Sequence, residues 1–303
     1  SLGKVAITEK EMYSNEAIMA FIDKGVEKIS PEYLYYLLRA KDWSKGTNKA
    51  VMGATLNKAT LSTIKIQLHE YDNQLEIVNM LNRVSSSIDF RKQQLTKLDE
   101  LIKARFVEMF GNAETTSQAQ TKRLEECCIS ISGGNTPSMQ HPEYYGGKIP
   151  FIKSGDVKSD HISVSSLTLT QIALNETTVK MLPKGTLIVV IRSAALLKEF
   201  RIGILDVDAV INQDLKALQT SDDVLPVYLM WAIKMKSQVL LSRVQTMLTS
   251  HIRMEDLLDL KVQIPHLSLQ NQFANFVAEI NKSKLLAEVF AQSTCILAEN
   301  RSK

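Results

Sequence analysis

The clearest hydrophobic pattern in the chain lies between Asn73 and Phe110, where no proline or glycine occurs. Apolar residues recur there with the spacing of a heptad seam, at positions 81, 84, 88, 95, 98, 102 and 109, and Arg91 and Arg105 take the two remaining seam positions. This pattern predicts one helix of about 37 residues with a single apolar stripe, roughly 55 Å long. Gly111-Asn112 follows the last apolar position and predicts the helix end.

A second, weaker helical pattern runs from Leu269 to the C-terminus, again without proline or glycine. We expect the two helices to pack antiparallel along the seam Leu81, Val84, Ile88, Leu95, Leu98 and Ile102. Two interpretations stay open. The long helix is either a bundle helix within a single globular domain or a spacer that holds two similar domains a fixed distance apart. Its length favours the spacer, because average helices run only about 11–12 residues.

Short apolar runs of β-type predict strands in "GKVAITE" (3–9), "STIKIQL" (62–68), "TLIVVIRS" (186–193) and "RIGILDV" (201–207). Residues 130–157 hold five of the 12 glycines and three of the 7 prolines. This stretch predicts a long looping surface with buried anchors at Ile149, Phe151 and Ile152. The fold class is therefore α+β, with β-rich domains, flanking helices and two long antiparallel spacer helices.

An internal repeat is the strongest long-range signal. A shift of about 196 residues brings the first part of the chain onto the last, in five ordered matches: 4–7 with 201–204, 15–18 with 212–215, 29–38 with 224–233, 64–68 with 260–264, and Gln74 with Gln270. The repeat predicts two related domains with a helix after each. The expected boundaries are 1–71 for the first domain, 72–112 for its helix, 113–268 for the second domain and 269–303 for its helix.

The two copies differ in extent, because nothing in the first copy corresponds to residues 120–197. The chain also opens with Ser1. We therefore expect it to be a piece or a processed product of a longer protein. We also expect residues 1–71 either to be completed by a second protomer or a separate fragment, or to be the less stable part of the chain.

Composition narrows the class of protein. With 45% hydrophobic and 23% charged residues the chain is typical of a soluble globular protein, and no stretch reaches the roughly 18 apolar residues of a membrane helix. Three cysteines, two of them adjacent, form no disulfide framework or zinc pattern, so we expect a cytoplasmic protein with no membrane partner. A net charge of +3 is compatible with a local basic patch that binds nucleic acid, but it does not by itself indicate one.

Catalytic motifs are missing from the sequence. It contains no G-x-x-x-x-G-K-[ST], no G-x-G-x-x-G, no H-E-x-x-H and no Asn-Pro-Pro or Asp-Pro-Pro motif of adenine methyltransferases. The five histidines are scattered, and Cys127-Cys128 is interpreted as a pair of buried small hydrophobic residues. We therefore expect no enzyme activity and no cofactor in this chain.

The polar residues of the loops suit binding instead. Arginine and lysine contact phosphates and the guanine edge, while hydroxyl and amide side chains read other base edges. The candidate DNA-contacting residues are Thr136, Ser138, Tyr144, Tyr145, Lys148, Lys153, Ser154, Arg192, Lys198 and Arg201. We expect the 133–156 loops and the 192–201 segment to share one face and form a basic concavity.

Five ordered segments resemble the specificity subunit of bacterial type I restriction-modification systems. They are "KLDELIKARFVEMFG" (97–111), "LEECCISISGGNTPS" (124–138), "YYGGKIPFIKSGDV" (144–157), "NQDLKAL" (212–218) and "IPHLSLQNQFANFV" (264–277). The resemblance implies two target-recognition domains, each reading one half of a split sequence in double-stranded DNA, with the helices setting the gap between the halves.

The resemblance also implies partners. They are modification subunits, which methylate adenine with S-adenosylmethionine, and a restriction subunit that uses ATP and Mg²⁺. Two other functions stay open. One is a protein–protein scaffold with degenerate recognition domains from a rearranged or truncated gene. The other is a methyltransferase fused to a recognition domain, which the missing methyltransferase motifs disfavour.

Overall fold

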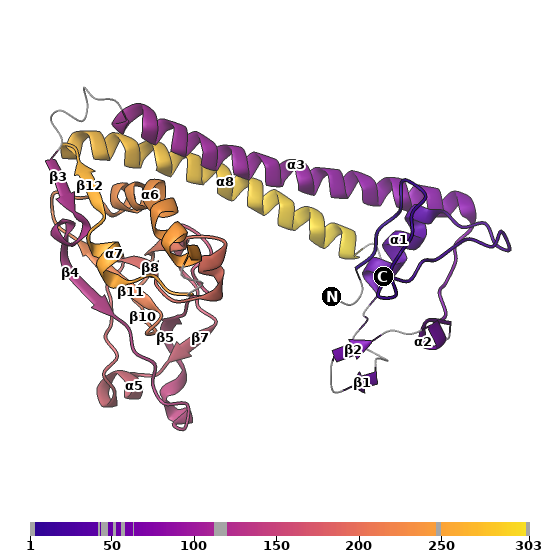
Figure 1. Ribbon diagram of the computed structural model, residues 1–303, viewed down its shortest axis with the longest axis horizontal. Helices are drawn as coiled ribbons and strands as arrows, with labels where there is room; N and C mark the ends of the chain where they lie inside the picture. Colours follow the sequence, from indigo (N-terminus) through magenta and orange to yellow (C-terminus); the bar gives the residue numbers. More distant parts are fainter. Residues whose placement is uncertain are drawn as a thin grey trace. The chain divides into compact units, whose positions relative to one another are not determined.

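The structure is a computed structural model that describes residues 4–41, 43, 48–50, 53–55, 58–62, 64–111, 120–246 and 250–300. Contacts divide the chain into two compact units, one of residues 1–95 with 286–303 and one of residues 96–285 (Figure 1). The predicted helix-end residue Asn112 and the last three residues of the predicted second helix lie outside the described residues.

The first unit is built around α1 (Pro31–Ala40) and the first half of α3 (Tyr71–Phe110), and it includes β1 (Asn48–Ala50), β2 (Gly53–Thr55) and α2 (Lys58–Ser62). The α1 helix starts at a sequence typical of a helix N-terminus. The Ser30 hydroxyl accepts from the Tyr33 N–H at 3.3 Å as the N-cap, and Pro31 takes the first helical position. The β1 and β2 strands pair antiparallel.

A buried glutamine ties α1 to α3 in this unit. Gln74, only 1% exposed, accepts from the Ser30 N–H at 2.9 Å through Oε1. Its Nε2 donates to the carbonyls of Lys28 and His69 at 3.1 and 2.8 Å. All three hydrogen bonds satisfy backbone groups. These groups lie at the helix ends, where they have no partner within the helix, or in the loops beside those ends. We call this arrangement the glutamine clamp.

The second unit repeats the glutamine clamp. Gln270, fully buried in α8 (Leu267–Asn300), accepts from the Leu225 N–H at 2.8 Å. Its Nε2 donates to the carbonyls of Asp223 and Pro265 at 2.9 and 2.8 Å. The internal repeat of the sequence therefore corresponds to a repeat of structure.

Three sheets form the second unit. The main sheet has the order β4 (Cys128–Gly133), β11 (Leu215–Thr220), β8 (Leu187–Val190), β9 (Ile202–Leu205), β6 (His161–Ile162). A smaller sheet has the order β10 (Val210–Ile211), β5 (Tyr145–Ile152), β7 (Leu167–Leu169), and β12 (Lys261–Ile264) pairs antiparallel with β3 (Gln120–Arg123). The helices between them are the long α6 (Pro226–Thr246) and the short η1 (Leu124–Cys127), η2 (Pro142–Tyr144), α5 (Gln171–Glu176), η3 (Ala194–Leu197) and α7 (Met254–Leu258).

The β8 strand explains how this unit holds two cores. Its side chains point alternately to opposite faces of the sheet. Leu187 and Val189 enter a large core with α6 and α8, while Ile188 and Val190 enter a smaller core with β5 and β10. All four residues are 0% exposed, which is why the sequence presents an unbroken apolar run at this point.

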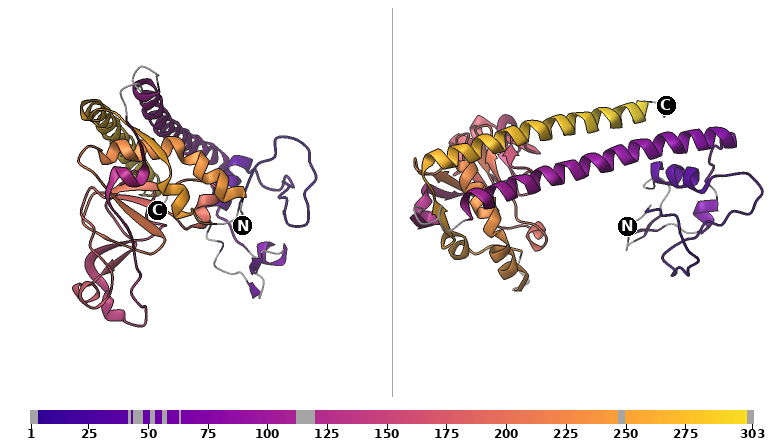
Figure 2. Two further views of the ribbon diagram at one scale, coloured as in Figure 1. Left: turned by 60° about the vertical axis from the view of Figure 1, so that its left-hand side comes forward. Right: turned by 90° about the horizontal axis from the view of Figure 1, so that it is seen from above.

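The α3 and α8 helices run antiparallel within the second unit. Phe110, at the end of α3, packs edge-on against Phe273 near the start of α8, with ring centroids 5.6 Å apart. Asp99, earlier in α3, is ion-paired with Lys284, later in α8, at 2.5 Å. Both views of Figure 2 keep α8 alongside this half of α3. The predicted antiparallel pair is confirmed over this part of the two helices.

The predicted apolar seam of α3 is visible in its exposure. The seam positions from 81 to 109 are buried or half-buried, and most residues between them are exposed. Ile102 is fully buried, and the Gly111 N–H donates to the Val107 carbonyl at 2.7 Å where the helix ends. The predicted start at Asn73 is two residues late, because α3 begins at Tyr71.

Two predicted strands are absent from the first unit. Residues 4–9 and 64–68, the described parts of these predictions apart from Ser62, take no strand conformation, and Ile7 and Ile66 are 44% and 41% exposed. Their counterparts in the second unit, β9 and β12, pair with β8 and β3, which come from residues 120–190. The described residues of the first unit provide no such neighbour, so these segments lack the partner that a strand requires.

Candidate nucleic-acid interface

The ends of five strands in the second unit meet at one edge, beside the turn Asn212–Asp214. The β5 and β10 strands run parallel, with Ile152 opposite Ile211, so Lys153 and Asn212 leave the sheet together. The β11 strand then starts between β4 and β8, because Lys216 lies opposite both Gly133 and Val189. Loops that follow β4, β5, β8 and β10 therefore converge at this edge, which we call the loop edge.

The turn itself is held by backbone hydrogen bonds to the ends of two of these strands, β5 and β8. The Asn212 N–H donates to the Ile152 carbonyl at 3.1 Å, and the N–H groups of Ile191 and Arg192 donate to the Asp214 carbonyl at 2.9 and 3.2 Å. Asn212 Nδ2 donates to Asp214 Oδ2 at 2.9 Å, while the buried Asn212 Oδ1 has no partner among the described residues. The same asparagine turn occurs at Asn15 in the first unit, where the Ile18 N–H donates to its carbonyl at 3.1 Å.

Glycine allows the β4 loop to reach the turn. A Cβ atom on Gly134 would lie 2.1 Å from the Ile211 carbonyl oxygen and 2.4 Å from that of Asn212. Any other residue would push the loop away from the turn. Thr136 then places its hydroxyl on the Gln213 amide oxygen.

Several sequence-predicted residues lie at the loop edge. They are Thr136, Lys153, Ser154 and Arg192, and all of them are exposed or half-buried. The exposed Ser138 follows Pro137, whose carbonyl accepts from Tyr145, so it lies toward the other end of β5. The Arg192 side chain is 64% exposed, with Nη1 3.9 Å from Asp214 Oδ1, which is too long for a hydrogen bond. Hydroxyl, amide, ammonium and guanidinium groups thus share one edge, which is the mixture that base edges and phosphates require.

The two predicted tyrosines lie at the other end of β5 and have structural contacts. Tyr144 is 8% exposed, its O–H donates to Glu176 at 3.2 Å, and its ring stacks on His141. Burial, with a smaller contribution from the Glu176 carboxylate, raises its pKa. The Tyr145 O–H donates to the Pro137 carbonyl at 2.6 Å, and burial raises its pKa. The exposed Lys148 lies on the same part of β5.

The remaining two predicted cations follow η3, close to the C-terminal end of β8. Lys198 is exposed, and its N–H donates to the Ala195 carbonyl at 2.9 Å. Arg201 is ion-paired with Glu199, with its Nε 2.7 Å from the carboxylate. Its carbonyl accepts from the Val190 N–H at 3.0 Å, so this segment borders the loop edge.

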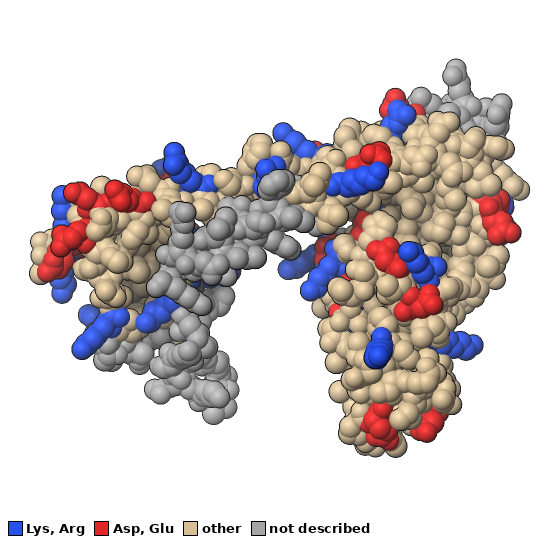
Figure 3. All heavy atoms as spheres, turned by 180° about the vertical axis from the view of Figure 1, so that it is seen from behind, with Lys and Arg blue, Asp and Glu red and all other residues tan. Residues whose placement is uncertain are grey.

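Charge on the second unit is mixed on the face seen in Figure 3. Lysine and arginine side chains are scattered among aspartate and glutamate, with no continuous positive patch on this face. The basic concavity expected from the sequence stays a prediction. The positive groups at the loop edge are few and separate, namely Lys153, Arg192 and Lys216.

Both units match one family model. The model describes the type I restriction modification DNA specificity domain, and it matches residues 1–100 and 116–289. The chain belongs to this family. The two matched ranges coincide with the two copies of the glutamine clamp, so each copy is a specificity domain or a part of one.

Curated relatives are type I specificity subunits. One from Methanocaldococcus jannaschii is 27% identical over 223 residues, which cover 67% of this chain and 50% of the relative. One from Escherichia coli is 25% identical over 148 residues, covering 48% of this chain and 37% of the relative. The chain thus spans half or less of the length of the curated relatives it matches.

Solved structures share the fold of the specificity domains. The specificity subunit from M. genitalium aligns with a TM-score of 0.52 at 13% identity, over 89% of this chain and 70% of that one. A chain from a study of complex assembly and conformational transition in the type I system aligns with a TM-score of 0.51 at 15% identity, over 89% and 67%. These likenesses show the mixed helix-and-sheet fold with long helices.

No metal site occurs in the described part of the specificity domains, where no group of three or more His, Cys, Asp or Glu side chains is placed to hold an ion. Burial raises the pKa of Cys127 to about 11 and that of Cys128 to about 12. Both thiols are therefore protonated near neutral pH. Cys127 is buried as predicted, whereas Cys128 is half-buried. None of the helices in the described ranges is apolar enough over a sufficient length to cross a membrane.

Sequence reasoning did not include the turn residues Asn212, Gln213 and Asp214 among the candidate site residues. Their signal was present, because "NQDLKAL" carries both the family resemblance and one match of the internal repeat. Asparagine and aspartate favour turns, since their side chains bond to nearby backbone. The turn matters because the ends of β5 and β8 are hydrogen-bonded to it and the loop after β4 contacts it through Thr136.

Proposed function

We propose that this chain is a DNA-recognition component of a type I restriction-modification system and that the loop edge of its second specificity domain contacts the DNA. The convergence of the 133–136, 153–156, 191–193 and 212–214 segments carries the proposal. Loops on a rigid sheet are the usual carriers of binding residues. The loop edge combines amide, hydroxyl and cationic groups within one small area.

Positively charged side chains without ion-pair partners also support DNA contact at the loop edge. Lys153 at the loop edge and Lys198 beside it form no ion pair among the described residues, so their ammonium groups can meet phosphates without breaking a salt bridge. Arg192 has only a long approach to Asp214. Phosphate contacts would position the domain, and Arg192 with Gln213 offers the donors and acceptor that base edges recognise.

The chain itself would supply recognition and no chemistry. Methylation of adenine with S-adenosylmethionine would belong to modification subunits, and ATP- and Mg²⁺-dependent restriction to a restriction subunit. In this proposal α3 and α8 provide the spacer between two recognition domains and the surface on which the partner subunits dock. The ion pair of Asp99 with Lys284 and the packing of Phe110 on Phe273 support a stiff spacer beside the second domain.

The test is DNA binding by the chain assembled with type I modification subunits. A pool of duplexes with randomised positions is selected for binding, and affinity for the selected duplex is measured by fluorescence anisotropy at several salt concentrations. Arg192→Ala and Lys153→Ala should each weaken binding by about 1–3 kcal/mol where a base edge is contacted. A phosphate contact would instead reduce the salt slope by about one for every sequence.

The matched control is Lys184→Ala. Lys184 is exposed and precedes β8, whereas Arg192 follows it, so the control removes the same charge at the opposite end of one strand. Its binding should stay within twofold of the parent chain. Equal affinities for the Arg192→Ala, Lys153→Ala and Lys184→Ala variants would remove the loop edge from the DNA contact. No selected duplex at all would favour the scaffold function.

A further inference from the structure

Two arginines of the second unit share one carboxylate. Arg253, the residue before α7, donates to Asp256 through Nε at 2.9 Å and through Nη2 at 3.3 Å. Arg243, near the end of α6, donates to the same carboxylate through Nη1. The Asp256 side chain is 13% exposed, whereas each arginine side chain is 51% exposed. Asp256 therefore holds two half-exposed guanidinium groups, each with N–H donors that it does not use. We call these three residues the arginine cluster.

The segment before the arginine cluster joins it to the loop edge. Two backbone hydrogen bonds, of 2.9 and 2.8 Å, connect residues 250–252 with residues 191–193, so that His251 lies opposite Arg192 in an antiparallel bridge. The bonds flank this pair instead of joining it, and such a pair places its two side chains close together on one face. His251 also lines one small cavity with all three residues of the arginine cluster. The cluster thus continues the loop edge beyond Arg192.

The internal repeat indicates that the shared fold does not depend on these charges. The α2 helix matches α7 at the same shift of 196 residues. At the positions of the charged residues the first unit carries uncharged ones, namely Thr55 for His251, Asn57 for Arg253 and Thr60 for Asp256. Arg243 lies beyond the part of α6 that α1 repeats, because α1 ends at Ala40, the match of Met235. The glutamine clamp occurs in both units, whereas the arginine cluster has no copy in the first.

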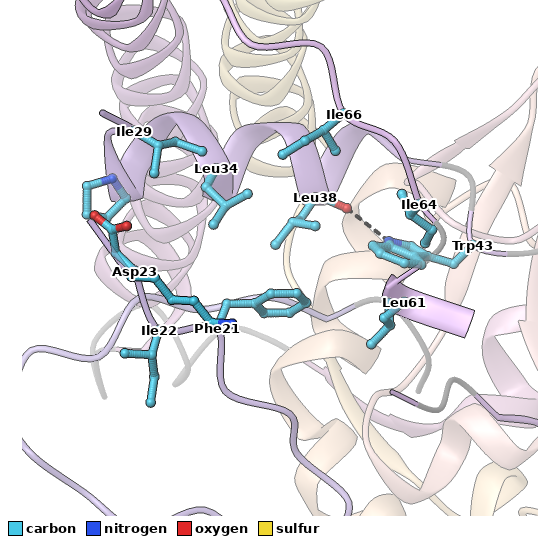
Figure 4. Close-up of a pocket in the computed structure, with 12 residues that line it drawn as sticks. Phe21, Ile22, Asp23, Ile29, Leu34, Leu38, Trp43, Leu61, Ile64 and Ile66 are labelled. Atoms are coloured by element: carbon cyan, nitrogen blue, oxygen red, sulfur yellow. Dashed lines mark hydrogen bonds between the residues drawn. The ribbon is translucent and has the colours of Figure 1, made fainter. Parts of the chain in front are cut away.

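The apolar side of the same segment is kept in both units. Leu257 and Leu260, in the large core of the second unit, are at most 8% exposed. Their matches in the first unit are Leu61 and Ile64, which line an apolar groove beside α1 (Figure 4). The packing residues of this segment therefore repeat while its charged residues do not. This is the pattern expected of a binding surface carried on a shared scaffold.

We propose that the arginine cluster contacts the phosphate backbone of the DNA beside the bases that meet the loop edge. A guanidinium group held by a carboxylate keeps a fixed plane, and its remaining donors can bind two oxygens of one phosphate. Arg243 and Arg253 are the contacting residues, and Asp256 holds both of them. Phosphate contacts set the register of a domain on the duplex and carry no sequence information. The identity of the ligand as DNA rests on the proposed function.

The test measures the salt dependence of DNA binding by this chain assembled with type I modification subunits. Affinities for the selected duplex and for an unrelated duplex are measured by fluorescence anisotropy at several salt concentrations. Arg243→Gln and Arg253→Gln should each weaken binding of both duplexes by the same factor, about threefold or more. Each should also reduce the slope of log affinity against log salt by about one. The ratio of the two affinities should stay within twofold of the parent value.

Two further variants separate a phosphate contact from a purely structural role. Arg253→Lys keeps the charge but not the planar group, so the salt slope should stay at the parent value while the affinity falls. The matched control is Arg123→Gln. The Arg123 side chain is 47% exposed and ion-paired with Asp259, but it belongs to the two-stranded sheet of β3 and β12 and not to the loop edge. Its slope and both affinities should match those of the parent chain.

Unchanged salt slopes in both Arg243→Gln and Arg253→Gln would overturn the inference, and so would a change of the same size in Arg123→Gln. A loss of affinity confined to the selected duplex would assign the arginine cluster to base edges and overturn the phosphate contact. If Arg192→Ala still weakens binding in these cases, the proposed function stands without this inference. If no duplex is selected at all, the two fail together.

Discussion

Gln74 and Gln270 occupy the same place in the two units, each joining the start of a long helix to the backbone before a second helix. Each accepts one backbone N–H and donates to two carbonyls, and each side chain is at most 1% exposed. A buried amide that serves three backbone groups fixes how the helix enters its domain. The clamp therefore fixes how each long helix enters its own specificity domain.

Replacement of Gln270 by leucine should destabilise the second unit strongly. Gln270→Leu keeps the volume but leaves one buried N–H and two carbonyls without partners, which should cost about 3 kcal/mol or more. Urea denaturation of the full chain measures the loss. The control is Asn271→Leu on the next, exposed position of α8, which removes a single bond to the Leu267 carbonyl and should stay within about 0.5 kcal/mol. Equal midpoints for the two variants would contradict the role of the clamp.

The seam of α3 offers a pair of adjacent positions with opposite exposure. Ile102 is 0% exposed and Leu101 is 46% exposed. Ile102→Asp buries an unpaired carboxylate and should cost several kcal/mol or unfold the second unit, whereas Leu101→Asp should change stability by about 0.5 kcal/mol or less. Thermal unfolding followed by circular dichroism distinguishes them. A destabilisation of the same size at both positions would show that the helix pair has no buried side here.

Two glycines of the loop region should respond differently to a methyl group. Gly134→Ala forces the β4 loop off the Asn212 turn, because its Cβ would overlap two carbonyl oxygens, and we expect a loss of about 2–4 kcal/mol. Gly155→Ala adds its Cβ in open space and should be neutral. Differential scanning calorimetry of the full chain gives both values. Neutral behaviour of Gly134→Ala would mean that the loop moves freely on the turn.

Alkaline pH should weaken the second unit through its two thiols. Folding raises the pKa of Cys127 from 9.0 to about 11 and that of Cys128 to about 12, so the unfolded chain loses these protons at lower pH than the folded one. The stabilisation is fully present below pH 9 and is lost as pH rises toward 11. Urea denaturation at pH 7 to 10.5 measures the decline. The stability of a Cys127→Ala/Cys128→Ala variant should decline less steeply with pH, because the two thiols are gone. Some decline should remain, because Tyr228, whose pKa is also raised by burial, is present in both proteins. Parallel curves would contradict the prediction.

The long helices and the strands β8 and β9 of the second unit followed directly from the sequence, whereas the predicted looping surface at 130–157 was wrong in part, because β4 ends and β5 forms within it. The heptad seam of α3 and the apolar run of β8 are local patterns whose partners lie within the same unit. Residues 4–10 and 64–68 carry comparable β-type patterns but form no strand. An apolar β-type sequence pattern favours strand pairing, but a strand forms only where a neighbouring strand is present to pair with it.

The candidate site was less accessible to sequence reasoning. Lysine, arginine and tyrosine were selected for their chemistry, yet Tyr144 and Tyr145 are held by Glu176 and Pro137. The Asn212 turn organises the loop edge but contains no aromatic or positively charged residue. It lies at this edge because of the order in which the strands pair in the sheets. Such order arises from the parallel pairing of β5 with β10 and is not visible in any local window of sequence.

The packing of Phe110 on Phe273 has a consequence for synthesis of the chain. The two rings close the end of α3 against the start of α8, yet about 160 residues separate them along the chain. At the roughly 5–20 residues per second of translation, the apolar side of α3 leaves the ribosome about 8–30 s before its partner exists. During that interval the buried side of α3 has no α8 to cover it. A chaperone that binds extended hydrophobic stripes would meet α3 during that interval and would leave it once α8 has been made.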